Sequence, residues 1–160
     1  TRVGRAVHGV VQVLPFDDPL PLVPALAAQQ CRAEEVPQRF VPYVELLVRS
    51  IATSEAFERM RRAAATSTVR REMYVGGEVD GEGVYGIIDA VWMEEGRFVV
   101  VDFKTDHVLE TPEVLAERYR DQLAAYAGAL RAATGRDVGE TMLCVARADG
   151  TPALTVAIAV

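Results

Sequence analysis

Apolar residues in the first 65 positions recur with the period of an α-helix. Val7, Val10, Val11 and Leu14 are three or four residues apart, which predicts a helix over Gly4–Leu14. A proline-rich segment, residues 15–24, then breaks the chain. Further helices are predicted over Ala25–Glu35, Val41–Ala52 and Glu55–Ala65.

After Thr66 the pattern changes to short runs of β-forming residues. Strands are predicted over Thr68–Val75, Val84–Met93 and Arg97–Lys104. Gly76-Gly77 and Asp80-Gly81 are expected to separate the first two strands, and Glu95-Gly96 to form a tight turn before the third. The three strands are predicted to form an antiparallel meander.

The last part of the chain begins with a long amphipathic pattern. Apolar and aromatic residues at spacings of three and four predict a helix over Glu113–Thr134, with Gly135 as its C-terminal cap. Two strands, Thr141–Arg147 and Ala153–Val160, are predicted to follow, joined by a turn at Asp149-Gly150. A helical front with a sheet behind it is expected to form one domain over residues 1–160.

Composition supports an ordinary globular domain, since 50% of the 160 residues are hydrophobic and 25% are charged. A chain of this length buries roughly 70% of its unfolded surface and needs no disulfide or metal to hold its core. Cys31 and Cys144 are too few for an iron-sulfur cluster or a four-thiolate zinc site. We expect a soluble cytoplasmic protein without a membrane segment. Because the chain begins with Thr1 and not Met, we expect it to be part of a longer polypeptide.

The net charge of −6 argues against a protein that holds nucleic acid by bulk electrostatics alone. It leaves room for a nucleic-acid enzyme, because carboxylates that gather around divalent cations lower the formal charge. Among the 17 basic residues, Lys104 is the only lysine.

Two charges stand at the end of an apolar strand. Asp102 and Lys104 follow Phe98–Val101, and the alternation of side chains puts them on one face while Phe103 turns to the other. A compact ammonium can orient a water or a phosphoryl oxygen in a way that a guanidinium does not. A functional site and a simple salt bridge at a strand end both remain open at this point.

Asp89 lies between apolar neighbours in the preceding predicted strand. If that strand pairs with Arg97–Lys104 through the Glu95 turn, Asp89 comes close to Asp102. Two such carboxylates repel unless a proton or a divalent cation lies between them. Glu72 could add a third carboxylate, although a solvated glutamate at a sheet edge would look the same.

Three further positions carry candidate chemistry. His8 lies on the first predicted helix, either as a core residue with one hydrogen bond or as a metal ligand. On the long helix, Tyr119, Gln122 and Tyr126 share one face. A glutamine in an apolar stripe needs hydrogen-bond partners, which a nearby charged site would supply.

Together these residues resemble the nuclease domain of the RecB and AddA helicase-nucleases, in the PD-(D/E)XK superfamily. The matching positions cover the chain from end to end and are Gly4–His8, Glu72, Gly86–Asp89, Asp102–Asp106, Tyr119, Gln122 and Tyr126. The resemblance implies an α/β fold with a restriction-endonuclease-like core, in which helices flank a mixed central sheet. It also implies that the chain is the C-terminal part of a helicase-nuclease.

The resemblance implies a role for each matching residue. His8, Asp89 and Asp102, with the Phe103 carbonyl, would bind Mg²⁺ or Mn²⁺, and Glu72 would join the catalytic carboxylates. Lys104 would orient the attacking water, while Gln122 and Tyr126 would hold Lys104 and the DNA strand. No iron-sulfur cluster is expected, because the chain lacks the four cysteines of the cluster-containing relatives.

The expected activity is metal-dependent cleavage of DNA, mainly single-stranded, beside an ATP-dependent helicase domain of the same polypeptide in double-strand-break repair and recombination. Whether a second helicase-nuclease subunit takes part stays open. A basic stretch is expected either to contact the DNA backbone or to form a solvated face; it comprises Arg59, Arg61, Arg62, Arg70 and Arg71. The alternatives are a catalytically silent module that guides DNA or holds subunits together, and a small-molecule domain with an acidic pocket.

Overall fold

The computed structural model describes residues 1–79, 81–105 and 110–160. Of the predicted positions, Asp80 and Asp106 lie outside these residues. The described chain divides into two compact units. The first comprises residues 1–62, 103–105 and 144–155. The second comprises residues 63–79, 81–102, 110–143 and 156–160. Whether the chain acts as one domain stays a prediction.

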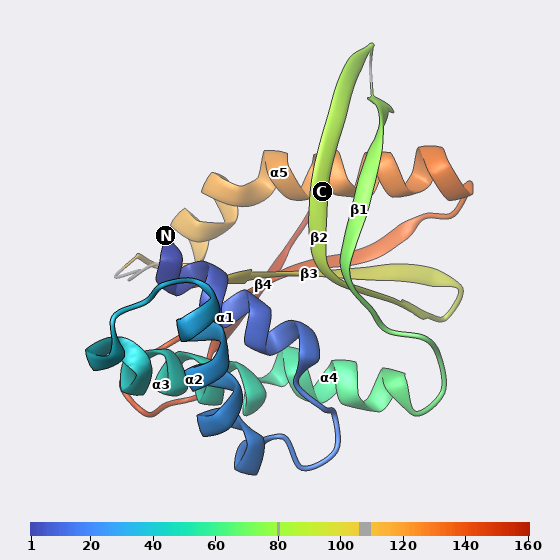
Figure 1. Cartoon of the computed structure of the whole chain (residues 1–160). Coiled ribbons are helices and arrows are strands. Elements are labelled where there is room, and N and C mark those ends of the chain that lie inside the picture. Colours follow the sequence, from blue (N-terminus) through green and yellow to red (C-terminus); the bar gives the residue numbers. More distant parts are fainter. Residues whose placement is uncertain (80, 106–109) are drawn as a thin grey trace. The chain divides into compact units, whose positions relative to one another are not determined.

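The first unit is built mainly from helices. Its elements are α1 (Arg2–Val13), η1 (Leu20–Leu22), α2 (Val23–Ala33), η2 (Gln38–Phe40), α3 (Val41–Ala52) and most of α4 (Glu55–Ala64). Helices α1, α2 and α3 pack against one another (Figure 1). The apolar stripe predicted for α1 is buried, since Val7, Val10 and Leu14 are fully enclosed.

Two helix boundaries in this unit have clear local causes. Thr1 caps α1, because its Oγ1 accepts a hydrogen bond from the Gly4 amide at 3.0 Å. Helix α2 begins at Val23, two residues before the predicted start, with Pro24 in its first turn. The prediction treated Pro24 as a break, but proline is tolerated in a first helical turn because its missing N–H has no partner there anyway.

The second unit contains the first two strands and the long helix: β1 (Arg70–Val79), β2 (Glu82–Glu94) and α5 (Pro112–Thr134). Strands β3 (Arg97–Lys104), β4 (Val138–Val145) and β5 (Leu154–Ile158) lie partly in it. In the described chain these strands form one sheet in the order β1-β2-β3-β4-β5.

The predicted meander is confirmed, because β1–β2 and β2–β3 both pair antiparallel. The sheet is mixed, because β3 and β4 run parallel. The Phe98 amide donates to the Asp137 carbonyl at the start of β3, and the Ala146 amide donates to the Lys104 carbonyl at its end. The predicted α/β fold with a mixed central sheet is therefore confirmed.

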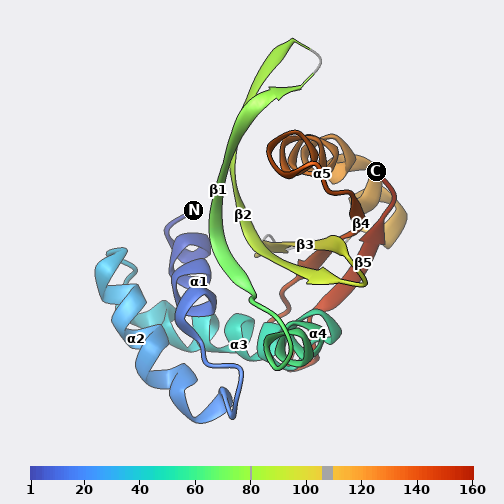
Figure 2. The same cartoon turned by 90° about the vertical axis from the view of Figure 1, so that its right-hand side faces the viewer.

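The β1–β2 pair is longer than predicted. Gly76 and Gly77 were expected to end the first strand, but they pair with Tyr85 and Val84 inside the ladder. The paired partner strand supplies the hydrogen bonds that outweigh the weak strand preference of glycine. The result is a long ribbon that curves around α5 (Figure 2).

Helix α5 confirms the predicted amphipathic element almost to the residue. Leu115, Leu123 and Leu130 are buried, and the helix packs on β1 and β2. Gly135 ends it with φ 69°, a left-handed conformation that costs glycine little. No helix in the described residues is long and apolar enough to cross a membrane.

Candidate metal-binding and nuclease site

Three predicted site residues form a row across neighbouring strands of the second unit. In the β1–β2 ladder, Arg71 pairs with Ala90 and Met73 with Ile88. Glu72, between them on β1, therefore stands opposite Asp89 on β2. Ala90 pairs with Val101 at the end of the β2–β3 ladder, so Asp89 and Asp102 each adjoin the last residue pair of that ladder. Residues directly opposite in a ladder point to the same face. The register therefore puts Glu72 opposite Asp89, and Asp102 next to the end of the ladder beside Asp89.

Glu72 and Asp89 are crowded together, and both aspartates are shielded from water. The ligand oxygens of Glu72 and Asp89 lie within 4.8 Å of each other. Asp89 is 7% exposed and Asp102 4%. Negative groups held this close repel one another, and a divalent cation with oxygen ligands relieves the repulsion. The chemistry and spacing of these side chains fit a divalent cation.

Glu72 has an unusual backbone conformation. Its φ of 52° lies in the left-handed region, although it stands within a strand and is not glycine. The pairs on both sides of it keep the same register, so the distortion is confined to this residue. Such strain costs of order 1–3 kcal/mol and is concentrated at functional sites in proteins.

Gln122 and Tyr126 lie on one face of α5, as predicted, and are hydrogen-bonded. The Gln122 amide nitrogen Nε2 donates to the Tyr126 hydroxyl at 3.0 Å. The tyrosine ring packs against β2 at Gly86, where a Cβ would be only 2.6 Å from the ring atom Cε1. Gly86 therefore allows the helix to approach the strand, a role the sequence did not reveal. The only sequence signal for this close approach was a glycine beside apolar residues in a predicted strand.

The remaining predicted ligands belong to the first unit. His8 lies on α1, with its ring edge-on to the ring of Phe103 at a centroid distance of 6.5 Å. Phe103 is buried, and the Lys104 carbonyl accepts a hydrogen bond from the Ala146 amide at 2.8 Å. A Cβ at Gly4 would lie 3.1 Å from Thr105 Oγ1, so α1 passes close to the residues that follow Phe103.

The predicted basic stretch is divided between the two units. Arg59, Arg61 and Arg62 lie on α4 in the first, whereas Arg70 and Arg71 lie on β1 in the second. Arg61 makes two 2.8 Å hydrogen bonds to Glu58, and this pairing lowers the pKa of the Glu58 carboxyl. Burial lowers the pKa of Arg71 to about 10. Whether these arginines contact DNA stays a prediction.

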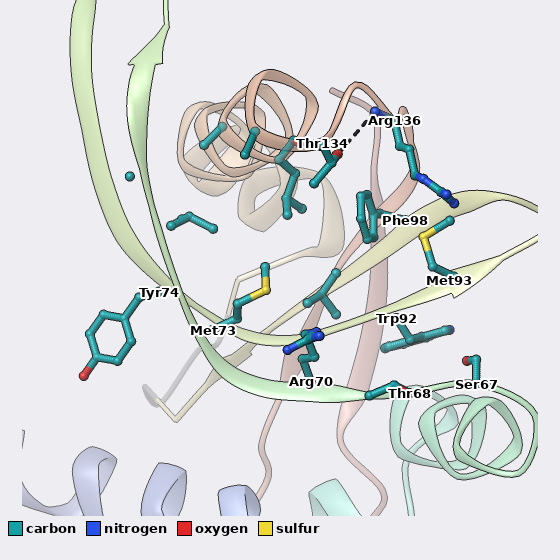
Figure 3. A pocket seen from close by; sticks show the side chains of 16 residues that line it. Ser67, Thr68, Arg70, Met73, Tyr74, Trp92, Met93, Phe98, Thr134 and Arg136 are labelled. Atoms are coloured by element: carbon teal, nitrogen blue, oxygen red, sulfur yellow. Dashed lines mark hydrogen bonds between the residues drawn. The ribbon is translucent and has the colours of Figure 1, made fainter.

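The second unit also contains an apolar cavity of 590 Å³ between β1, β2 and the end of α5. Met73, Met93 and Phe98 point into it, whereas Tyr74 points away (Figure 3). The Arg136 amide donates to Thr134 Oγ1 at 3.2 Å beside the cavity (Figure 3). The sequence analysis did not identify this cavity or the outward orientation of Tyr74.

Comparison with known proteins agrees with this fold. The family model of the PD-(D/E)XK nuclease superfamily matches residues 1–156, and the chain belongs to that superfamily. The resemblance seen in the sequence is thereby confirmed.

Similar curated proteins are named as subunits of an ATP-dependent helicase/nuclease. The protein from Streptococcus sanguinis is 31% identical over 142 residues, which cover 84% of this chain and 11% of the relative. The protein from Desulforudis audaxviator is 36% identical over 158 residues, which cover 88% of this chain and 13% of the relative. The chain thus spans about a tenth of the length of these relatives.

Proposed function

We propose that this chain is a metal-dependent nuclease that hydrolyses phosphodiester bonds, mainly in single-stranded DNA. The observation that carries the proposal is the row formed by Glu72, Asp89 and Asp102 across three adjacent strands. Membership of the PD-(D/E)XK nuclease superfamily supports the same chemistry.

In this proposal, His8, Asp89, Asp102 and the Phe103 carbonyl hold Mg²⁺ or Mn²⁺. The bound cation would polarise the scissile phosphate and lower the pKa of a water molecule. Oxygen ligands from carboxylates and a carbonyl suit both ions. No iron-sulfur cluster takes part, since the chain has only two cysteines.

The other residues position the reactants. The Lys104 ammonium orients the attacking water for in-line attack on phosphorus, and Glu72 completes the catalytic carboxylates. Gln122 and Tyr126 hold Lys104 and the DNA strand. Their hydrogen bond and the packing of Tyr126 on Gly86 keep both side chains in one orientation on α5.

We further propose that the nuclease acts beside an ATP-dependent helicase domain in the same polypeptide, in the cytoplasm, during double-strand-break repair and recombination. The relatives, whose names describe an ATP-dependent helicase/nuclease, support this assignment. The net charge of −6 supports a domain that binds DNA weakly by itself and receives a single strand from the helicase. A second helicase-nuclease subunit is an additional proposed partner.

The test is cleavage of labelled single-stranded DNA with Mg²⁺ or Mn²⁺, together with calorimetric titration of Mn²⁺. Asp102→Asn is expected to lose both metal binding and cleavage, and Lys104→Ala to lose cleavage while it keeps metal binding. Glu117→Gln, an exposed carboxylate paired with Arg120 on α5, is the matched control. Wild-type protein that binds Mn²⁺ in neither the presence nor the absence of DNA would favour a catalytically silent module.

A further inference from the structure

We propose that the face of the β1–β2 ribbon opposite to α5 binds unpaired DNA bases, which stack on the exposed rings of Tyr74 and Tyr85. This inference rests on the proposed function, because it names the place where a single-stranded substrate is held. It assigns a binding role to two tyrosines that the catalytic site does not use.

Both tyrosines are exposed to an unusual degree. Tyr74 is 82% exposed and Tyr85 85%, so neither ring is covered by the described protein. Figure 3 shows Tyr74 pointing away from the cavity that Met73 enters. Helix α5 covers the other face, where Tyr126 packs on Gly86. Aromatic rings displayed on an uncovered sheet face are a common feature of binding surfaces.

The register puts the two tyrosines near each other on one face. Tyr74 pairs with Ile87 and Gly76 with Tyr85, so the tyrosines are diagonal neighbours, about 7–8 Å apart. The Tyr85 ring lies along β2 over Gly83, where a Cβ would be 3.2 Å from its Cε2 atom. Each ring therefore offers an exposed face on which a base of one strand can stack.

A shallow hollow of 470 Å³ lies at this place. Tyr74, Gly76, Tyr85 and Ile87 all line it. Gly76 has no side chain opposite Tyr85, and Ile87 supplies an apolar floor opposite Tyr74. The hollow thus combines two aromatic residues with an apolar one, which is the composition of a stacking platform for single-stranded nucleic acid.

The platform is continuous with the carboxylate row. Asp89, Ile87 and Tyr85 are successive side chains on one face of β2. Their exposed fractions rise from 7% through 37% to 85%, so this face leads from the buried carboxylate into solvent. A strand anchored by one base at the tyrosines can extend along this face towards Asp89.

The chemistry of the platform selects an unpaired base over a duplex or a phosphate. The bases of a duplex are already stacked on their neighbours and present no open face to a tyrosine. Glu78 and Glu82 near the end of the ribbon are exposed carboxylates, which repel phosphate groups. The attraction must therefore come from stacking, which depends little on salt.

The test compares the affinities of an oligothymidylate and of an abasic strand of equal length for the full chain, measured by fluorescence anisotropy in EDTA. Tyr74→Ala and Tyr85→Ala are each expected to weaken binding of the oligothymidylate at least about fivefold. They should leave binding of the abasic strand unchanged. Tyr74→Phe and Tyr85→Phe should retain wild-type affinity, because phenylalanine stacks equally well. Tyr43→Ala on α3 is the control.

The outcomes separate this inference from the proposed nuclease activity. Alanine variants that bind both strands like the wild type, or that lose affinity for both strands equally, would overturn the platform even if the wild type cleaves DNA. The same holds if the full chain binds no single-stranded DNA. Conversely, a base-dependent loss of affinity supports the platform even if no cleavage is found, because binding is measured without a divalent cation.

Discussion

The carboxylates of Glu72 and Asp89 meet across β1 and β2, with ligand oxygens within 4.8 Å, at a point where the Glu72 backbone has φ 52°. Charge repulsion and backbone strain both oppose folding there. Their coincidence at one cross-strand pair is what a site built for a cation requires, since the cation compensates the repulsion.

The strain at Glu72 predicts an inverted preference between alanine and glycine. Glu72→Gly is expected to be more stable than Glu72→Ala by about 1 kcal/mol, because only glycine adopts a positive φ without cost. At Val75, which lies in the same strand and is not among the residues with positive φ, alanine should be the more stable of the two. The denaturant midpoints of the alanine and glycine variants at each position measure these differences in stability. Alanine more stable than glycine at both positions would contradict strain at Glu72.

The crowding at Asp89 predicts opposite effects with and without metal. Asp89→Asn removes one of the repelling charges, so its melting temperature in EDTA should equal or exceed that of the wild type. Mn²⁺ should raise the melting temperature of the wild type, since binding at 100 times Kd contributes about 2.7 kcal/mol. The variant should lose this increase, whereas Glu117→Gln should keep it. A Mn²⁺ shift that survives in Asp89→Asn would place the metal elsewhere.

The approach of α5 to β2 predicts a steric penalty at Gly86. Gly86→Ala introduces a Cβ 2.6 Å from the Tyr126 ring and should destabilise the protein by about 1–3 kcal/mol. Gly77→Ala is the control, because nothing lies within 4 Å of its added Cβ in the same ribbon. Tyr126→Leu should reduce the penalty of Gly86→Ala in a double-mutant cycle. Additive effects of the two substitutions would show that the ring is not the obstacle.

Cys31 is expected to be chemically inert in the folded protein. Burial, with a smaller contribution from Glu45, raises the pKa of its thiol. Near pH 8.5, about the pKa of a free cysteine, the folded protein should therefore hold Cys31 as the thiol and react slowly with iodoacetamide. Alkylation in denaturant gives the unprotected rate. Equal rates in the two conditions would contradict a buried, protonated Cys31.

The arginines of β1 and α4 give a salt-dependence prediction. If Arg70 contacts a phosphate, Arg70→Glu should reduce the slope of log affinity against log salt for single-stranded DNA by about 0.7. Arg62, which is 3.9 Å from Glu58 on α4, allows the same test in the first unit. An unchanged slope in both variants would assign these arginines to a solvated surface.

Much of the fold was predictable because helices and strands follow local periodicity. Helix α3 and strand β3 begin and end at the predicted residues, and α5 begins one residue early. Several other boundaries differ by one to four residues. Two of them, at Val23 and at Gly76-Gly77, are places where a tertiary or capping partner outweighs the local preference of proline or glycine.

The sequence by itself determined the elements, the meander and the identity of the candidate carboxylates, since an apolar strand that carries Asp102 or Asp89 is a local signal. Only the tertiary structure decided that Glu72 stands opposite Asp89 with a strained backbone, that Gly86 admits Tyr126, and that Tyr74 and Tyr85 share an uncovered face. Each of these depends on strand register or on helix packing. Both are set by contacts between residues far apart in the chain, which no local pattern encodes.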